Sequence, residues 1–185
     1  GVGSGAGRNL RYNDLARRHS FETEESKALY GDDCRFQFYG GHRLWLSPES
    51  GSATYYPDNR PVLYGIRPDS VCFTPEMQRH NHMQLGLELM LSEGSSDMMV
   101  VHTVTNRSKR DVTLSLWAVT MMAPGGLEII PQNRGGEQFL PNRVLVLWPY
   151  SNPKDQRLHW GPRLLTLDSS NSAGLARIPY SIAAS

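Results

Sequence analysis

The segment Gly40-Gly41-His42-Arg43-Leu44-Trp45 places several kinds of binding chemistry next to one another in the chain. Its two glycines allow positive φ angles and a close approach of a ligand to the backbone. Arg43 carries five hydrogen-bond donors in a rigid fork, which suits hydroxyl groups or a carboxylate, and Trp45 offers a flat apolar face to a sugar. We therefore predict a ligand-binding segment here. The alternative is a tight turn in which Arg43 pairs with a structural acid such as Glu49 or Asp58.

Two further segments extend the predicted site. Asp58 and Asn59 lie in a loop, where binding residues often lie above a rigid scaffold, although both are equally good turn formers. Asn142 and Arg143 lie at the expected start of a strand, where polar side chains can converge on a pocket. The predicted substrate-binding residues are Arg43, Trp45, Tyr55, Asp58, Asn59, Asn142, Arg143 and Trp148.

Two histidines separated by one residue indicate a different chemistry. On a strand, residues i and i+2 face the same side, so His80 and His82 would present both imidazoles together, with His102 or Glu88 as a third metal ligand. The spacing loosely resembles the first cupin motif, with a gap to Glu88 that is one residue too long. The alternative is a pair of polar side chains on the solvent face. A sugar-binding protein needs no cofactor, whereas the cupin-like alternative requires one divalent metal ion held by His80, His82 and His102.

Short apolar alternations between turn residues predict a mainly β fold. Residues 82–91 place Met83, Leu85, Leu87, Leu89 and Leu91 on one strand face. The only helical candidate of any length, a weak one, spans residues 13–30, and residues 106–110 form a polar turn. We predict one antiparallel β-sandwich domain over residues 13–185 behind a flexible tail at residues 1–12. Further strands are expected at residues 34–39, 61–66, 70–74, 98–105, 112–122, 127–130, 144–148, 163–167 and 174–179.

The composition limits the classes of partner. Lys and Arg (19) nearly balance Asp and Glu (18), which argues against nucleic acid or an anionic membrane as the main partner. No run approaches the roughly 18 apolar residues of a membrane-spanning helix. We expect a soluble protein, with the cytoplasm slightly favoured over the periplasm or secretion, that binds a carbohydrate or another small polar ligand. Cys34 and Cys72 are expected as buried free thiols, with a single bridge as the alternative.

Three segments in order, Tyr39 to Glu49, Trp117 to Gly126 and Leu140 to Tyr150, together with Thr54 to Asn59, resemble a known family. It is an uncharacterised bacterial family of galactose-mutarotase-like proteins, within the aldose 1-epimerase superfamily. The resemblance covers roughly residues 34–167. It implies a supersandwich fold and a sugar pocket shaped by Gly40-Gly41 and by Trp45 to Pro48.

Aldose epimerases open the sugar ring with a histidine acid and a glutamate base near the C-terminus. The strand that looks equivalent here, Leu114 to Met122, contains no histidine, and the base would fall beyond Ser185. For an epimerase or isomerase, His42 is then the nearest proton-transfer group, with Glu49 as its partner. A non-catalytic interaction domain is the remaining alternative. A sandwich that stops at residue 185 exposes a strand edge, which we expect an oligomer or a further C-terminal segment to cover.

Overall fold

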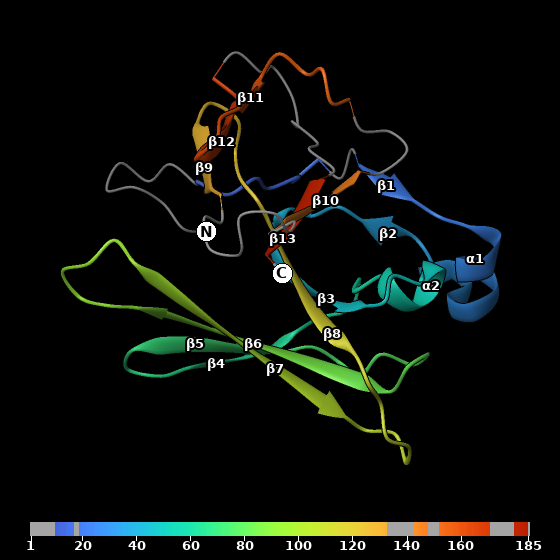
Figure 1. Cartoon of the computed structure of the whole chain (residues 1–185). Helices are drawn as coiled ribbons and strands as arrows, with labels where there is room; N and C mark the ends of the chain where they lie inside the picture. The colour runs from blue at the N-terminus through green and yellow to red at the C-terminus, as the bar shows by residue number, and fades with distance from the viewer. Residues whose placement is uncertain (1–9, 17–18, 133–142, 148–151, 171–179, 185) are drawn as a thin grey trace. The chain divides into compact units, whose positions relative to one another are not determined.

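The chain is mainly β, with its strands paired in antiparallel sheets (Figure 1). The computed structural model describes residues 10–16, 19–132, 143–147, 152–170 and 180–184. The chain divides into two compact units. The first unit is residues 11–121, and the second contains the chain from residue 122 onward together with residue 10. Within the described ranges, every strand pair belongs to one unit, so the single sandwich domain and its mutarotase type stay predictions.

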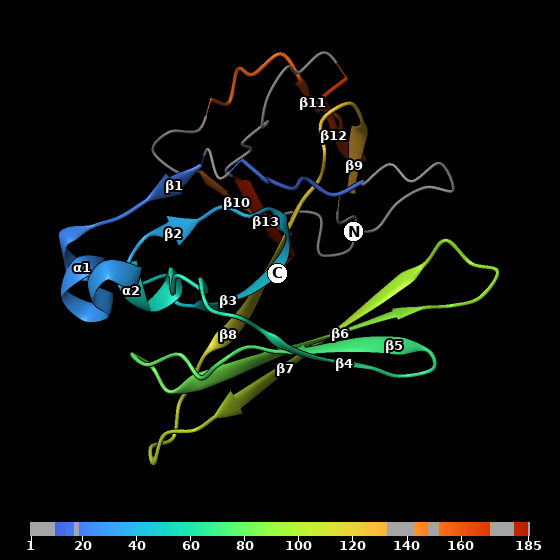
Figure 2. The same ribbon diagram turned by 180° about the vertical axis from the view of Figure 1, so that it is seen from behind.

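The first unit contains a four-stranded sheet of order β4-β5-β6-β7 and two strand pairs, β3-β8 and β1-β2 (Figure 2). All of these pairings are antiparallel. In chain order the elements are β1 (Ser20–Phe21), α1 (Glu24–Tyr30), η1 (Gly31–Asp33), β2 (Phe36–Gln37), β3 (Gly41–Ser47), α2 (Gly51–Thr54), β4 (Leu63–Ile66), β5 (Ser70–Thr74), β6 (Met83–Leu91), β7 (Met98–Asn106) and β8 (Ser115–Met121).

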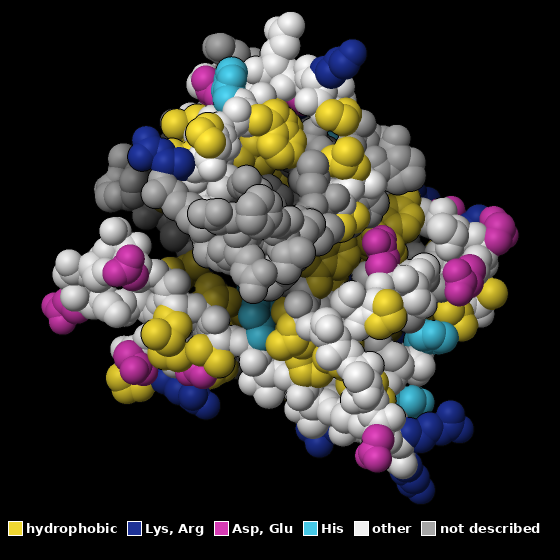
Figure 3. Space-filling view, in the orientation of Figure 1, with side chains coloured by type: hydrophobic (Ala, Val, Ile, Leu, Met, Phe, Trp, Pro, Cys, Tyr) yellow, Lys and Arg dark blue, Asp and Glu magenta, His cyan; other side chains and the backbone are white. Residues whose placement is uncertain are grey.

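The alternation over residues 82–91 correctly predicts β6. Leu87 lies directly opposite His102 of β7, so both side chains are on the same face of the sheet. The outer strand β4 is far less covered, since the side chains of Leu63, Tyr64 and Ile66 are each at least 70% exposed. Apolar side chains accordingly gather on the surface of this part of the sheet (Figure 3).

Helix α1 is shorter than the helical candidate over residues 13–30. It begins at a capping box, in which Thr23 Oγ1 accepts from the Ser26 backbone N–H and Ser26 Oγ accepts from the Thr23 backbone N–H. It ends at Gly31, whose φ of 63° suits glycine. The helix does not extend before Thr23, because Ser20–Phe21 pairs with β2 instead.

Part of the predicted N-terminal tail is structured. The backbone N–H of Tyr12 donates to the carbonyl of Met121 at 2.9 Å, and the Gly41 N–H donates to the Tyr12 carbonyl at 2.8 Å. A Cβ on Gly40, which has a φ of 91°, would lie 2.3 Å from that carbonyl oxygen. The Gly-Gly pair therefore permits the close approach expected of it, but the partner is the chain's own backbone.

The second unit contains a three-stranded sheet, β11-β12-β9, and the pair β10-β13. Leu165 of β12 forms its core, with 1% of its surface exposed. The strands are β9 (Leu127–Pro131), β10 (Arg143–Leu147), β11 (Leu158–Trp160), β12 (Leu164–Asp168) and β13 (Tyr180–Ala184).

The structure bears on the state of the two cysteines and on whether a helix could span a membrane. Both cysteines are free thiols, with Cys34 buried and Cys72 half-buried. Across the described ranges, none of the helices has the length and hydropathy to cross a bilayer.

Candidate functional site

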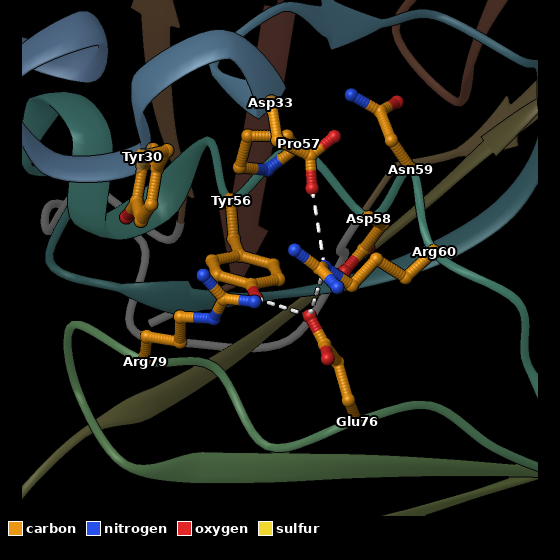
Figure 4. A pocket seen from close by; sticks show the side chains of 9 residues that line it. All are labelled: Tyr30, Asp33, Tyr56, Pro57, Asp58, Asn59, Arg60, Glu76 and Arg79. Atoms are coloured by element: carbon orange, nitrogen blue, oxygen red, sulfur yellow. Dashed lines mark hydrogen bonds and ion pairs between the residues drawn. The ribbon is translucent and has the colours of Figure 1, made fainter.

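The first unit carries a small hollow beside the segment that follows α2 (Figure 4). It is partly open to solvent, and its volume of about 10 Å³ has room for about one water molecule, far below the usual range for drug-sized ligands. Its walls come from the end of α1 and η1, from the loop between α2 and β4, and from the loop between β5 and β6. The lining residues are Tyr30, Asp33, Tyr56, Pro57, Asp58, Asn59, Arg60, Glu76 and Arg79.

Arg43 of β3 holds the loop that forms one wall of the hollow. Its Nη2 donates to the Tyr56 carbonyl oxygen at 2.7 Å and pairs with Asp58 Oδ2 at 2.6 Å. Its guanidinium lies 4.7 Å from the centre of the Phe36 ring, a cation–π contact. Arg43 thus fixes Tyr56 and Asp58 in place, which matches the predicted alternative of a structural ion pair.

Burial sets the titration of the ion pair and of the neighbouring tyrosine. It raises the pKa of Asp58, against the opposing effect of the Arg43 charge. Burial also raises the pKa of the Tyr56 hydroxyl, and the hydrogen bond and negative charge of Glu76 raise it further. Tyr56 is therefore a neutral phenol at physiological pH, able to donate one hydrogen bond and accept others.

A second set of charged side chains, centred on Arg60 and Glu76, also lines the hollow. The Tyr56 hydroxyl donates to Glu76 Oε1 at 2.8 Å, and Arg60 Nε lies 3.3 Å from the same oxygen and 3.2 Å from Asp33 Oδ2 (Figure 4). The Tyr30 and Tyr56 rings meet edge to face with their centres 5.3 Å apart. The hollow thus offers carboxylate acceptors, guanidinium donors and an aromatic wall to a single small ligand.

Two of the predicted binding residues, Asp58 and Asn59, lie in this hollow. Asn59 Oδ1 accepts from the Tyr39 hydroxyl at 2.8 Å, and Asn59 Nδ2 donates to the Arg35 carbonyl at 2.8 Å. Asp58 has a φ of 48°, as expected of a turn former. Asp58 therefore has the backbone conformation of a turn former, and both residues line the hollow.

Trp45 and Tyr55, predicted to stack on a sugar, pack into an aromatic cluster instead. Their ring centres are 5.2 Å apart, and Trp45 lies 4.8 Å from Trp117, its partner across the β3-β8 pair. Among the residues that the structure describes, the buried Trp45 Nε1–H has no hydrogen-bond partner, which is unusual for a tryptophan. The cluster consists of Phe21, Phe36, Phe38, Trp45, Tyr55 and Trp117.

The predicted acid–base pair, His42 and Glu49, does not meet in the structure. His42 lies near the start of β3, whereas Glu49 follows its end at Ser47. A strand rises about 3.3 Å per residue, so β3 separates residues 42 and 47 by roughly 17 Å. Glu49 accepts a hydrogen bond from the Tyr55 hydroxyl. These contacts give no support to His42 and Glu49 acting together on one sugar ring.

His42 instead pairs with His102 of β7. Their Nε2 atoms lie 2.7 Å apart, and the rings stack with their centres separated by 4.9 Å. His42 Nδ1 lies 2.7 Å from Thr120 Oγ1, its neighbour across the β3-β8 pair. An Nε2···Nε2 hydrogen bond requires one nitrogen to be unprotonated, so the pair cannot hold two added protons and stay bonded.

We expect the stability of the first unit to fall when the pH drops below about 6.5. Burial lowers the pKa of both imidazoles, and the charges of His102 and Arg11 lower that of His42 further. Below the unfolded pKa of 6.5, the unfolded chain binds more protons than the folded chain, so this stability is complete above pH 6.5 and is lost as the pH falls toward the folded values. Urea unfolding at pH 7.5 and 5.0 measures the loss, which should be smaller in His102→Gln. An equal loss in both proteins would exclude the pair as its source.

The structure changes the setting of the histidines that are predicted to bind metal. The spacing predicts a strand, but β6 begins only at Met83, and residues 79–81 form a turn. His82 has a φ of 57°, so the alternation of a strand does not apply to it. His102 contacts His42 instead. In the ranges that the structure describes, no group of three or more histidine, cysteine or carboxylate side chains is placed to hold a metal ion.

The remaining predicted site residues belong to the second unit. Asn142 and Trp148 lie outside the described residues, and for Arg143 only the backbone position at the start of β10 is described. Their role in ligand binding stays a prediction.

Of the residues that line the hollow, the sequence predicts only Asp58 and Asn59 as binding residues. Tyr56 and Arg60 flank the predicted pair Asp58 and Asn59, so their positions in the same loop are a usable signal. Glu76 and Arg79 lie in the loop between β5 and β6, and only the pairing of these strands brings that loop to the hollow. No pattern in the sequence indicates this proximity.

The chain was also compared with known proteins. A scan of protein-family models, a search of curated proteins and a search of solved structures each found no match. The resemblance to galactose-mutarotase-like proteins therefore stays a prediction.

Proposed function

We propose that the first unit binds a carbohydrate in the hollow between Tyr30, Tyr56 and Glu76. The observation that supports this proposal is the convergence of an aromatic wall with carboxylate and guanidinium groups on one small space (Figure 4). Sugars present hydroxyl groups that both donate and accept hydrogen bonds, and C–H faces that pack on aromatic rings. Glu76 and Asp33 supply acceptors, and Arg60 and Arg79 supply donors.

The proposal is limited to binding. Ring opening would need one group to protonate the ring oxygen and another to take the proton of the anomeric hydroxyl. His42 is bonded to His102 and Thr120, and Glu49 is bonded to Tyr55. Neither residue lines the hollow.

Calorimetric titration with glucose, galactose and their disaccharides tests this proposal. We expect binding in the millimolar range or tighter, and an affinity about fivefold lower in Tyr30→Ala, because the aromatic wall contributes roughly 1 kcal/mol. Tyr64→Ala is the matched control, since Tyr64 is 70% exposed on β4 and does not line the hollow. The proposal fails if wild type binds no saccharide at these concentrations, or if both tyrosine variants bind as wild type does.

A further inference from the structure

Three arginines lie in or beside the hollow, and they differ in how their charge is used. Arg43 pairs with Asp58 at 2.6 Å, and Arg60 lies within 3.3 Å of both Asp33 and Glu76. The Arg79 guanidinium makes no hydrogen bond or ion pair within the described part of the chain. Its donors are thus the ones that a ligand can satisfy without breaking an existing ion pair.

The backbone at Arg79 is held by a network of hydrogen bonds. The backbone N–H of Gln78 donates to the Met83 carbonyl at 2.8 Å, and the His82 N–H donates to the Gln78 carbonyl at 2.9 Å. Asn81 closes the turn, because its Nδ2 donates to Gln78 Oε1 at 2.7 Å and its Oδ1 accepts from the Met83 N–H at 2.9 Å. Gln78 itself is buried. The turn thus directs the Arg79 side chain along the Tyr56 ring toward the hollow (Figure 4).

The chemistry of this position favours an anionic oxygen group. A guanidinium matches the planar geometry of a carboxylate with two parallel hydrogen bonds, which are stronger than bonds to neutral hydroxyls. The charges of Arg43, Arg60 and Arg79 balance those of Asp33, Asp58 and Glu76, so these six lining and neighbouring side chains present no net negative charge to such a ligand. The Tyr56 hydroxyl, which donates its proton to Glu76, lies beside Arg79 and can accept a further bond.

We infer that Arg79 makes the hollow selective for a saccharide that carries a carboxylate, such as a hexuronate. This inference rests on the proposed carbohydrate binding and names its substrate class. The carboxylate forms a bidentate pair with the Arg79 guanidinium, while the sugar ring lies against the tyrosine wall and its hydroxyls bond the paired acids. Arg79 is the specificity-determining residue, and Tyr30 contributes to the affinity for acidic and neutral sugars alike.

Calorimetric titration of the full chain with D-glucuronate against D-glucose, and with D-galacturonate against D-galactose, tests this inference. We expect wild type to bind each uronate about tenfold more tightly than its neutral counterpart, which corresponds to one additional charged hydrogen bond. In Arg79→Gln the ratio of the two affinities should fall to about one. Arg110→Gln, a matched arginine in the exposed turn after β7, should keep the wild-type ratio.

The outcomes separate the two proposals. Equal affinities of wild type for acidic and neutral sugars would overturn the selectivity and leave carbohydrate binding in place. A tenfold preference that survives in Arg79→Gln would show that another group reads the carboxylate. Absence of binding by either class of sugar would overturn the proposed function and this inference together.

Discussion

Replacing Arg43 by alanine should lower the free energy of unfolding by about 3 kcal/mol. The substitution leaves Asp58 without its counter-charge and removes the donor to the Tyr56 carbonyl oxygen. The expected value is at the lower end for buried ion pairs, because the side chains of Arg43 and Asp58 keep exposures of 22% and 32%. Chemical denaturation followed by circular dichroism measures the change. Ligand binding should weaken as well, since the loop that lines the hollow loses its anchor.

A double-mutant cycle isolates the ion pair from other effects of the truncation. Asp58→Ala and the double variant Arg43→Ala/Asp58→Ala complete the cycle with wild type. We expect the double variant to be less destabilised than the sum of the two single changes, because each single change leaves a charge unpaired. Strictly additive effects would mean that the pair does not hold the loop.

Replacing Phe36 by alanine should cost about 3–5 kcal/mol of unfolding free energy. Phe36 is 2% exposed, and its ring centre lies 5.1–6.3 Å from those of Phe21, Phe38, Trp45 and Tyr55. It is the central residue of the aromatic cluster, so alanine leaves a cavity that rigid neighbouring rings cannot fill. Denaturant unfolding measures the loss.

Phe36→Leu is the matched control for this position. Leucine keeps most of the apolar volume, and we expect it to cost less than about 2 kcal/mol. If Phe36→Ala costs less than Phe36→Leu, or less than about 1 kcal/mol, the cluster is not the core of the first unit.

Most strands of the first unit were predictable because their pattern is local, whereas β1 and β3 (Gly41–Ser47) were not predicted. Residues 83–91 carry an apolar side chain at every second position, and β6 occupies these residues. The polar turn at residues 106–110 was also predictable from its residue types. In the structure, Asn106 Oδ1 accepts from the Ser108 backbone N–H and caps this turn. The pattern fails at His80 and His82, where a turn residue with positive φ breaks the alternation. A local pattern predicts a strand only where the backbone stays extended.

The candidate site was predictable only in part, because its residues come from separate loops that only the folded chain brings together. Tyr55 and Tyr56 are adjacent and equally suited to a sugar by type, yet Tyr55 packs in the aromatic cluster while Tyr56 lines the hollow. Arg43 has the donors of a ligand-binding residue, but Asp58 lies close enough to pair with them. Arg79 reaches the hollow through the fold of the loop between β5 and β6. Residue type alone does not separate these roles.

Chemical-shift mapping of the first unit tests the central claim most directly, because it locates the bound ligand. The full chain, labelled with ¹⁵N, is titrated with D-glucuronate and with D-glucose while amide resonances are followed. Our account predicts saturable shifts concentrated at Tyr30, at residues 58–60 and at residues 76–79, the segments that line the hollow. Shifts that leave these amides unchanged and cluster elsewhere, or no saturable shifts with either sugar, would contradict it.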